Sequence, residues 1–191
     1  MWQYYKVALV DSEWSIKVIQ PDGYKLLEHA YYNSRTMRRI EKLLYRDAHN
    51  VMWIWDYAEC ASFVWKHKFE DEEEINYERN LTEEDVLVKN PDDDYFLVNR
   101  SRDEFINMTR QEMKNDKEWT KWNWIHPLPI LCRANWEFWW GDYRPHMLNW
   151  EYMWNWCGDI ISIIHWKRDE IEKALKDNQF DDMTDVYFFK E

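Results

Sequence analysis

An imbalance between two residue types constrains this chain more than any other feature: glycine is scarce and tryptophan is abundant. The 191 residues include 15 tryptophans and only 3 glycines, whereas average usage would give about 13 glycines. Glycine is the usual residue where a turn requires a positive φ angle, and a bulky side chain is strained there. Because the excess of tryptophan is about as large as the deficit of glycine, we expect tryptophan at positions that favour glycine.

Local sequence context supports this interpretation. Trp14 lies within Asp11–Ser15, a turn-like stretch between two β-patterned runs, and Trp139 lies in a second loop-like stretch. We expect Trp14 and Trp139 to be exposed or to have positive φ angles. We expect Trp53 and Trp156 to be buried, as tryptophan in a strand usually is. The alternative is a tryptophan-rich binding surface, because tryptophan is common at interface hot spots.

Length and charge narrow the class of protein. A chain of 191 residues usually forms one domain. With 37 acidic and 25 basic residues the net charge is −12, and this field repels phosphate, which argues against direct nucleic-acid binding. No apolar run approaches the roughly 18 residues needed to span a bilayer, and early charged residues such as Lys6 and Asp11 argue against a signal peptide. We therefore expect a cytoplasmic protein without membrane association, with a protein partner left open.

The cysteines point to the same compartment. Cys60, Cys132 and Cys157 are isolated in the sequence and odd in number. This pattern is typical of reduced thiols and not of a disulfide framework or a zinc site. The sequence leaves the identity of any cofactor unknown.

Hydrophobic patterning predicts a single α+β domain over residues 1–191, mainly an antiparallel sheet with two to four helices. The expected strands are Gln3–Val10, Ile16–Ile19, Val51–Tyr57, Tyr95–Asn99, Glu104–Met108, Trp156–His165 and Val186–Phe189, with the proline-containing Trp124–Cys132 as an edge strand. The expected helices are Lys25–Tyr32, Arg35–Arg46, Glu59–Phe69 and Lys167–Lys176. Residues at about 70–94 contain two acidic runs and are expected to form a solvated excursion. A cation site there is the alternative, although the spacing of an EF-hand is absent.

Seven segments, spread over nearly the whole chain, carry a family resemblance. They are Met1–Asp11, Lys25–Tyr31, Trp53–Ala58, Tyr95–Ile106, Ile125–Pro129, Asn135–Tyr143 and Trp154–Asp159. The first is similar to a family start that reads Met-Gly-Gln-Tyr-Tyr-Lys/Arg, and the last is similar to Gly-Arg-Trp-Ala-Gly-Asp. In this order the segments resemble an uncharacterised family of bacterial and phage proteins. The resemblance implies a shared fold and a bacterial or phage context, and it brings no activity with it.

The departures from the family pattern follow the composition. Tryptophan stands where relatives carry glycine at Trp2, Trp55, Trp136, Trp139 and Trp154. Relatives also carry tryptophan at Trp53 and Trp156. Some bacterial lineages read UGA as glycine, so translation of that codon as tryptophan would produce this pattern. We therefore predict codon reassignment at the mismatched positions.

Candidate site residues are polar side chains set in otherwise apolar or turn-forming segments. They are His29, Asp56, His126, Asp142 and Asp159. Histidine with two or three carboxylates can perform general acid–base chemistry or hold a metal, so in an enzyme we expect these residues to share one cleft. In the alternative, the histidines are hydrogen-bonded core residues and the aspartates cap turns.

These residues lead to two functional hypotheses. The chain lacks GxSxG, P-loop, GxGxxG and HExxH motifs, which would each have identified a reaction class. The first hypothesis is a hydrolase-like enzyme that uses the His/Asp cluster. The alternative is a non-enzymatic acidic interaction protein that binds a basic partner or mimics nucleic acid.

Overall fold

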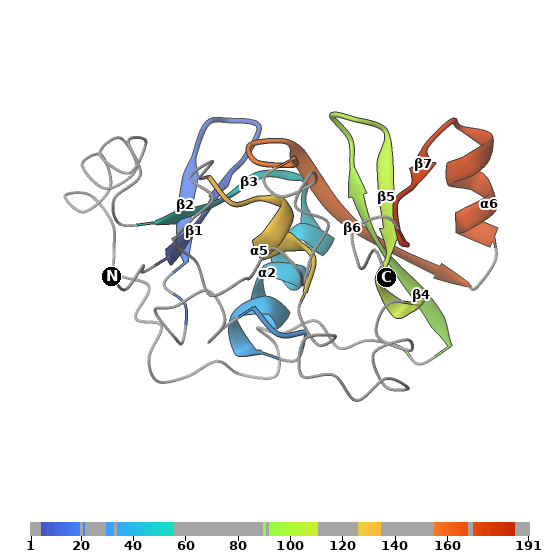
Figure 1. The fold of residues 1–191 in the computed structure, drawn as a ribbon, viewed down its shortest axis with the longest axis horizontal. Helices are drawn as coiled ribbons and strands as arrows, with labels where there is room; N and C mark the ends of the chain where they lie inside the picture. The colour runs from blue at the N-terminus through green and yellow to red at the C-terminus, as the bar shows by residue number, and fades with distance from the viewer. Residues whose placement is uncertain are drawn as a thin grey trace.

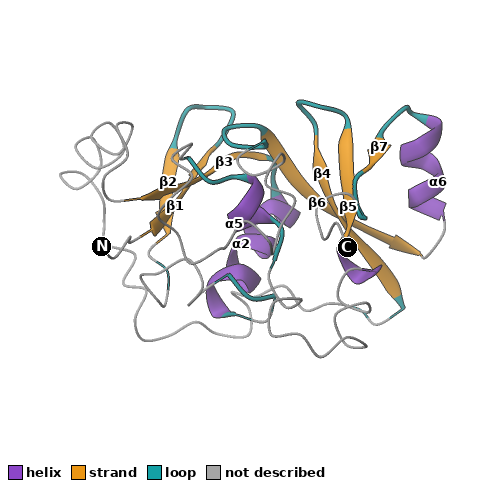
Figure 2. Cartoon of the chain, in the orientation of Figure 1, coloured by secondary structure: helices purple, strands orange, loops and turns teal. Residues whose placement is uncertain are grey.

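A seven-stranded sheet organises the residues that the computed structural model describes, which are 5–19, 21, 30–32, 34–55, 90, 92–110, 126–134, 155–167 and 170–185. The strand order is β2-β1-β3-β6-β4-β5-β7 (Figures 1 and 2). The strands are β1 (Tyr5–Val10), β2 (Ile16–Ile19), β3 (His49–Trp55), β4 (Asp93–Asn99), β5 (Glu104–Asn107), β6 (Ile160–Lys167) and β7 (Asp181–Asp182). Paired strands are antiparallel except for β5 and β7, which are parallel. The helices are α2 (Arg35–Arg46), α5 (Leu128–Leu131) and α6 (Glu170–Asp177). The predicted α+β class is confirmed.

The turn between β1 and β2 confirms the prediction for Trp14. The Asp11 N–H donates to the Ser15 carbonyl at 3.0 Å, and the Trp14 N–H donates to the Asp11 carbonyl at 3.1 Å. The Asp11 side chain also accepts the N–H groups of Glu13 and Ser15. In this kind of three-residue hairpin loop the last residue adopts a left-handed conformation that favours glycine. Trp14 is that residue, with φ of 63° and 84% of its surface exposed. Trp139 lies outside the described residues.

Two further non-glycine residues in the described part of the chain hold positive φ angles at turns. Asp103, with φ of 55°, precedes β5, and aspartate tolerates this conformation better than most side chains. Gln179, with φ of 68°, ends α6, where the Phe180 N–H bonds to the Leu175 carbonyl at 3.0 Å. This is a Schellman cap, whose left-handed position usually carries glycine. Residues other than tryptophan thus also occupy turn positions that usually carry glycine.

Helix α2 forms where the sequence predicts it. Ser34 caps its first turn, because the Ser34 hydroxyl accepts the Met37 N–H at 3.1 Å and satisfies one of the orphan donors. Met37, Ile40 and Leu44 recur at helical spacing and are fully buried. The opposite face of the helix remains in contact with solvent, as expected of an amphipathic helix.

The two faces of the sheet have different covers. Helices α2 and α5 lie against the middle of one face (Figure 1), where the largest buried cluster gathers side chains from β1, β3, β4 and β6. On the other face, Leu175 of α6 packs with Phe96, Val98 and Phe105 of β4 and β5. Alternation along each strand sends successive side chains to these two layers.

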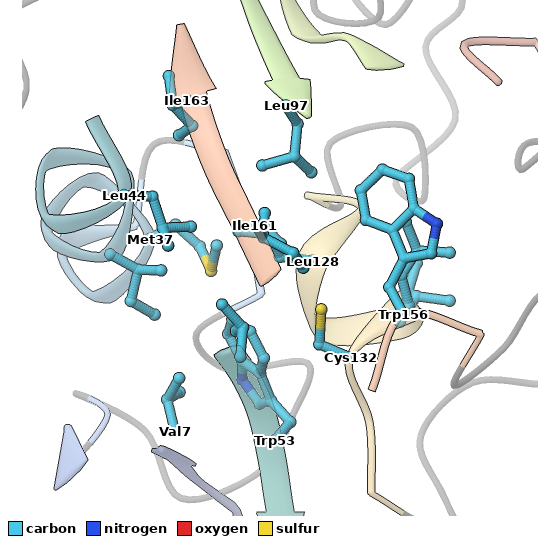
Figure 3. Packing of buried hydrophobic residues seen from close by; sticks show 14 of the residues in the cluster. Val7, Met37, Leu44, Trp53, Leu97, Leu128, Cys132, Trp156, Ile161 and Ile163 are labelled. Atoms are coloured by element: carbon cyan, nitrogen blue, oxygen red, sulfur yellow. The ribbon is translucent and has the colours of Figure 1, made fainter. Parts of the chain in front are cut away.

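Trp53 and Trp156 are central to the larger cluster, as predicted. Both are fully buried, and Figure 3 shows them on either side of Cys132. The Trp53 N–H donates to the Cys132 carbonyl at 2.7 Å, and the Trp156 N–H donates to the Leu131 carbonyl at 2.9 Å. Short segments far apart in the sequence therefore converge around these two rings.

The prediction of an edge strand at Trp124–Cys132 is wrong for its described part. Residues Leu128–Leu131 form α5, with Pro127 at its N-cap and Pro129 in its first turn. Proline fits this position because the first N–H groups of a helix have no partner inside the helix. The prolines therefore begin a helix at a place where we expected them to protect a strand edge.

Several boundaries also differ from the prediction. Strand β4 begins at Asp93, inside the expected acidic excursion, and β6 extends two residues beyond His165 to Lys167. Helix α6 begins at Glu170 instead of Lys167. The helices expected at Lys25–Tyr32 (apart from its last residues) and Glu59–Phe69, and the strand expected at Val186–Phe189, lie outside the described residues. Within the part of the chain that is described, no helix has the length and apolar character needed to cross a membrane.

Candidate functional site

His126 is a core residue with a buried carboxylate partner. It is fully buried, and its Nε2 lies 3.2 Å from Oε1 of Glu41, which is also fully buried. Its Nδ1 accepts the N–H of Leu128, the first residue of α5, at 3.2 Å. Its ring lies 4.9 Å from that of Tyr32. The pair Glu41–His126 therefore joins α2 to the start of α5, and a substrate has no direct access to a group so deeply buried.

Asp159 is held by a different set of partners. One carboxylate oxygen accepts the side-chain amide of Asn99 at 2.9 Å and Nε of Arg102 at 2.7 Å. The adjacent Gly158 has φ of 79°, and its carbonyl accepts the Asn50 side chain at 2.7 Å. These bonds tie the start of β6 to the β4–β5 turn, which agrees with the alternative that the aspartates stabilise turns.

The other predicted site residues cannot be placed on this framework. His29, Asp56 and Asp142 lie outside the described residues, so a shared cleft for the five stays a prediction. His126 and Asp159 have separate partners, Glu41 for the first and Arg102 with Asn99 for the second.

A third histidine forms the hydrogen-bonded chain that best fits proton transfer. His165, on β6, has its Nδ1 at 3.1 Å from Oδ2 of Asp93, which begins β4. Its Nε2 is hydrogen-bonded to the hydroxyl of Tyr45, in the last turn of α2. Helix α2 lies against β6 (Figure 1), and β4 is the next strand of the sheet. Three elements thus supply one residue each to the chain Asp93–His165–Tyr45.

The chemistry of the partners assigns the direction of these hydrogen bonds. A carboxylate can only accept, so Nδ1 of His165 donates to Asp93. In the neutral imidazole the other nitrogen then carries the lone pair, and Nε2 accepts the Tyr45 hydroxyl proton. The arrangement has a base between an orienting carboxylate and a hydroxyl group, which is the logic of a nucleophilic triad.

The surroundings hold this histidine in place. The Tyr95 ring stacks on the His165 ring at a centroid distance of 5.4 Å and an angle of 14°. Asp93 Oδ2 also accepts the Asn90 side-chain amide at 3.0 Å, while the Asn90 N–H donates to the Tyr95 hydroxyl at 2.7 Å. Packing and hydrogen bonds of this kind preorganise a reactive group.

Unlike the buried Glu41–His126 pair, this chain reaches the surface. The side chain of His165 is 33% exposed and that of Asp93 is 15% exposed, and Tyr45 is 39% exposed. A ligand can therefore approach Tyr45 from solvent, while Asp93 is the most buried of the three residues. Among the described residues, no group of three or more His, Cys, Asp and Glu side chains is close enough to hold a metal ion.

Sequence reasoning missed this site because its three residues have unremarkable contexts. Asp93 belongs to an acidic run that suggested a solvated excursion, and Tyr45 is an aromatic residue on an amphipathic helix. His165 follows a run of five apolar or small residues in β6. Its alternation with Ile161 and Ile163 indicates that it faces the main core. The sequence did not show that β4, which carries Asp93, pairs with β6.

Comparisons with models of protein families, with curated proteins and with solved structures find no match to this chain. The resemblance to a bacterial and phage family therefore stays a prediction, and the functional argument rests on the geometry of the Asp93–His165–Tyr45 chain.

Proposed function

We propose that this protein is a hydrolase-like enzyme whose reactive groups are Tyr45, His165 and Asp93. The observation that carries the proposal is the hydrogen-bonded chain from a carboxylate to an imidazole to the hydroxyl of an exposed tyrosine. The residue class matches the His/Asp cluster expected from the sequence, but the histidine is His165 and the aspartate is Asp93.

The reaction follows from the direction of the hydrogen bonds. The Tyr45 oxygen attacks an electrophilic carbon or phosphorus centre while its proton passes to Nε2 of His165. The bond to the leaving group then breaks, and the leaving group takes the proton from the imidazolium. In a second step water attacks the tyrosyl intermediate, gives its proton to His165 and releases the product, after which the proton returns to Tyr45. Covalent catalysis of this kind splits one difficult step into two easier ones.

Asp93 has a positioning role in this scheme. Its bond to Nδ1 selects the tautomer in which Nε2 faces the hydroxyl, and its charge stabilises the imidazolium that forms. Because Asn90 donates to the same carboxylate oxygen, the carboxylate cannot easily turn away. Substitution of Asp93 by asparagine would favour the wrong tautomer.

An arylsulfonyl fluoride tests the activation of Tyr45 without knowledge of the substrate. The reagent modifies tyrosine oxygens in proportion to their nucleophilicity, and peptide mapping by mass spectrometry reports the rate at each tyrosine. We expect Tyr45 to react at least about a hundredfold faster in the unmodified protein than in the His165→Ala variant, the low end of the contribution of a positioned base. Asp93→Asn is expected to reduce the rate and shift its pH profile.

A matched control keeps the test specific. Trp166 is next to His165 in the sequence, but its side chain points to the other side of β6 and is 57% exposed. The Trp166→Phe variant should therefore leave the labelling rate of Tyr45 unchanged. Equal labelling of Tyr45 in the unmodified protein and in His165→Ala would refute the proposal. Circular dichroism of each variant establishes that it is folded.

A further inference from the structure

The solvent face of α2 carries a concentration of positive charge in an acidic protein. This helix of twelve residues contains Arg35, Arg38, Arg39, Lys42 and Arg46, against one acidic residue, Glu41. Glu41 is fully buried against His126, so it does not neutralise the outer face. The whole chain, by contrast, has a net charge of −12.

The cations form a stripe. At 3.6 residues per turn, positions 35, 38, 42 and 46 fall within about a quarter of the helix circumference and extend about 16 Å along its axis. Arg35 and Arg46 are exposed, and Arg38 and Lys42 are half-buried. Within the described part of the chain these four side chains form no ion pair with a carboxylate. We call these four residues the basic stripe.

The N-terminal end of the basic stripe is unfavourable for helix stability, although Arg46, in the last turn, interacts favourably with the helix dipole. The first turn of α2 contains no acidic residue and begins with Arg35, although the positive end of the helix dipole disfavours cations there. Departures from local rules without a structural gain are typical of functional surfaces. This makes binding a better explanation of the stripe than stability.

The basic stripe runs beside the reactive tyrosine. Tyr45 follows Lys42 by three positions and Arg38 by seven, so all three lie along neighbouring parts of the helix surface. A ligand that neutralises the stripe is therefore brought to the Tyr45 hydroxyl. That ligand must be both a row of negative charges and an electrophile.

We propose that the basic stripe binds the phosphodiester backbone of a nucleic-acid strand and presents one of its phosphates to Tyr45. This inference rests on the proposed function, because it names the substrate class of the same site. Phosphodiesters meet both requirements, and arginine matches phosphate oxygens with paired N–H donors. Carboxylates of an acidic protein meet the first requirement but are poor electrophiles. The net charge of −12 opposes the approach of a nucleic acid, but charges farther from the stripe than about 8 Å are largely screened at physiological salt, so the local cations dominate at the stripe.

Salt dependence of binding provides a quantitative test. With a fluorescein-labelled 20-nucleotide poly(dT) strand, four neutralised phosphates predict a slope of about −2.8 for log K against log salt. Binding should thus weaken about 50-fold between 50 and 200 mM NaCl. In the Arg38→Gln/Lys42→Gln variant two contacts remain, and the same change in salt should weaken binding only about sevenfold.

A matched variant removes the same charge elsewhere. Lys17 on β2 and Lys173 on α6 are exposed, so Lys17→Gln/Lys173→Gln controls for net charge and should retain the original slope. An equal reduction of the salt slope in the control variant would overturn the inference, because binding would then depend on overall charge and not on the basic stripe. Displacement of the strand by polyglutamate at equal charge concentration would also overturn it and would favour an acidic protein partner.

Protection of Tyr45 separates this inference from the proposed function. Poly(dT) at a concentration that just saturates the unmodified protein should slow arylsulfonyl fluoride labelling of Tyr45 there, and should slow it much less in the weaker-binding Arg38→Gln/Lys42→Gln variant. Activated Tyr45 without strand binding or protection would refute the nucleic-acid substrate and leave the proposed function standing. Strand binding with unactivated Tyr45 would refute the proposed function, and with it the assignment of the strand as substrate.

Discussion

Replacement of Trp14 by glycine should stabilise the protein. Trp14 closes the β1–β2 turn with φ of 63°, a conformation that costs a residue with a side chain roughly 1–2 kcal/mol. Its ring is 84% exposed, so the substitution sacrifices little buried apolar area. The turn keeps its hydrogen bonds, which come from backbone groups and from Asp11.

The expected gain is the difference between two opposing effects. Glycine removes the steric strain of the left-handed conformation, but it also raises the conformational entropy of the unfolded chain at a cost of about 0.4–1 kcal/mol. The net stabilisation is therefore about 1 kcal/mol. For a chain of this length 1 kcal/mol raises Tm by about 2–4 °C.

Urea and thermal unfolding followed by far-UV circular dichroism measure this change without relying on tryptophan fluorescence. Trp166→Gly is the matched control, since Trp166 is also exposed but lies within β6, where its indole N–H donates to Glu170 at 2.8 Å. There glycine should destabilise the protein by about 0.5–1 kcal/mol. A Trp14→Gly variant that unfolds at the same or lower urea concentration than the unmodified protein would refute the idea that a glycine position is occupied by tryptophan.

Three other predictions concern the coding sequence, pH and thiol chemistry. Sequencing of the coding DNA should find UGG at Trp53 and Trp156. At the positions where relatives carry glycine it should find UGA, and UGG at all of them would exclude codon reassignment; these positions are Trp2, Trp55, Trp136, Trp139 and Trp154. Burial, followed by the charge of Lys17, lowers the pKa of His49 below its ordinary value of 6.5. The unfolded chain therefore binds this proton more tightly, so the free energy of unfolding is highest above about pH 6.5 and decreases as the pH falls below that value. In the His49→Gln variant the urea midpoint should vary less between about pH 5 and 7 than in the unmodified protein. Burial raises the pKa of the Cys132 thiol, and iodoacetamide should modify the half-buried Cys157 well before Cys132 in the folded protein, with equal rates refuting this order.

Features that depend on neighbouring residues were predictable from the sequence. Helix α2 has the predicted bounds because the Ser34 cap and the spacing of Met37, Ile40 and Leu44 are local signals. The β1–β2 turn was predictable for the same reason, and so was the strain at Trp14. The α+β class follows from the number and spacing of such elements.

The candidate site was decided by tertiary structure. Strand β6 comes after β4 and β5 in the sequence, yet it lies between β3 and β4 in the sheet. That placement pairs Tyr95 with His165 and brings Tyr45 of α2 and Asp93 of β4 to the same imidazole. Asp93 and His165 are separated by 72 positions in the sequence, and Tyr45 and His165 by 120.

The partners of individual polar residues were hidden for the same reason. The sequence marks His126 as a polar residue among apolar ones, but only packing shows that Glu41, a residue of the predicted helix, is its buried partner. Strand pairing and helix docking depend on hydrophobic contacts between distant segments, and a repeating apolar pattern fits many possible neighbours. Local patterns therefore determined which elements form, and the burial of those elements against one another determined which side chains meet.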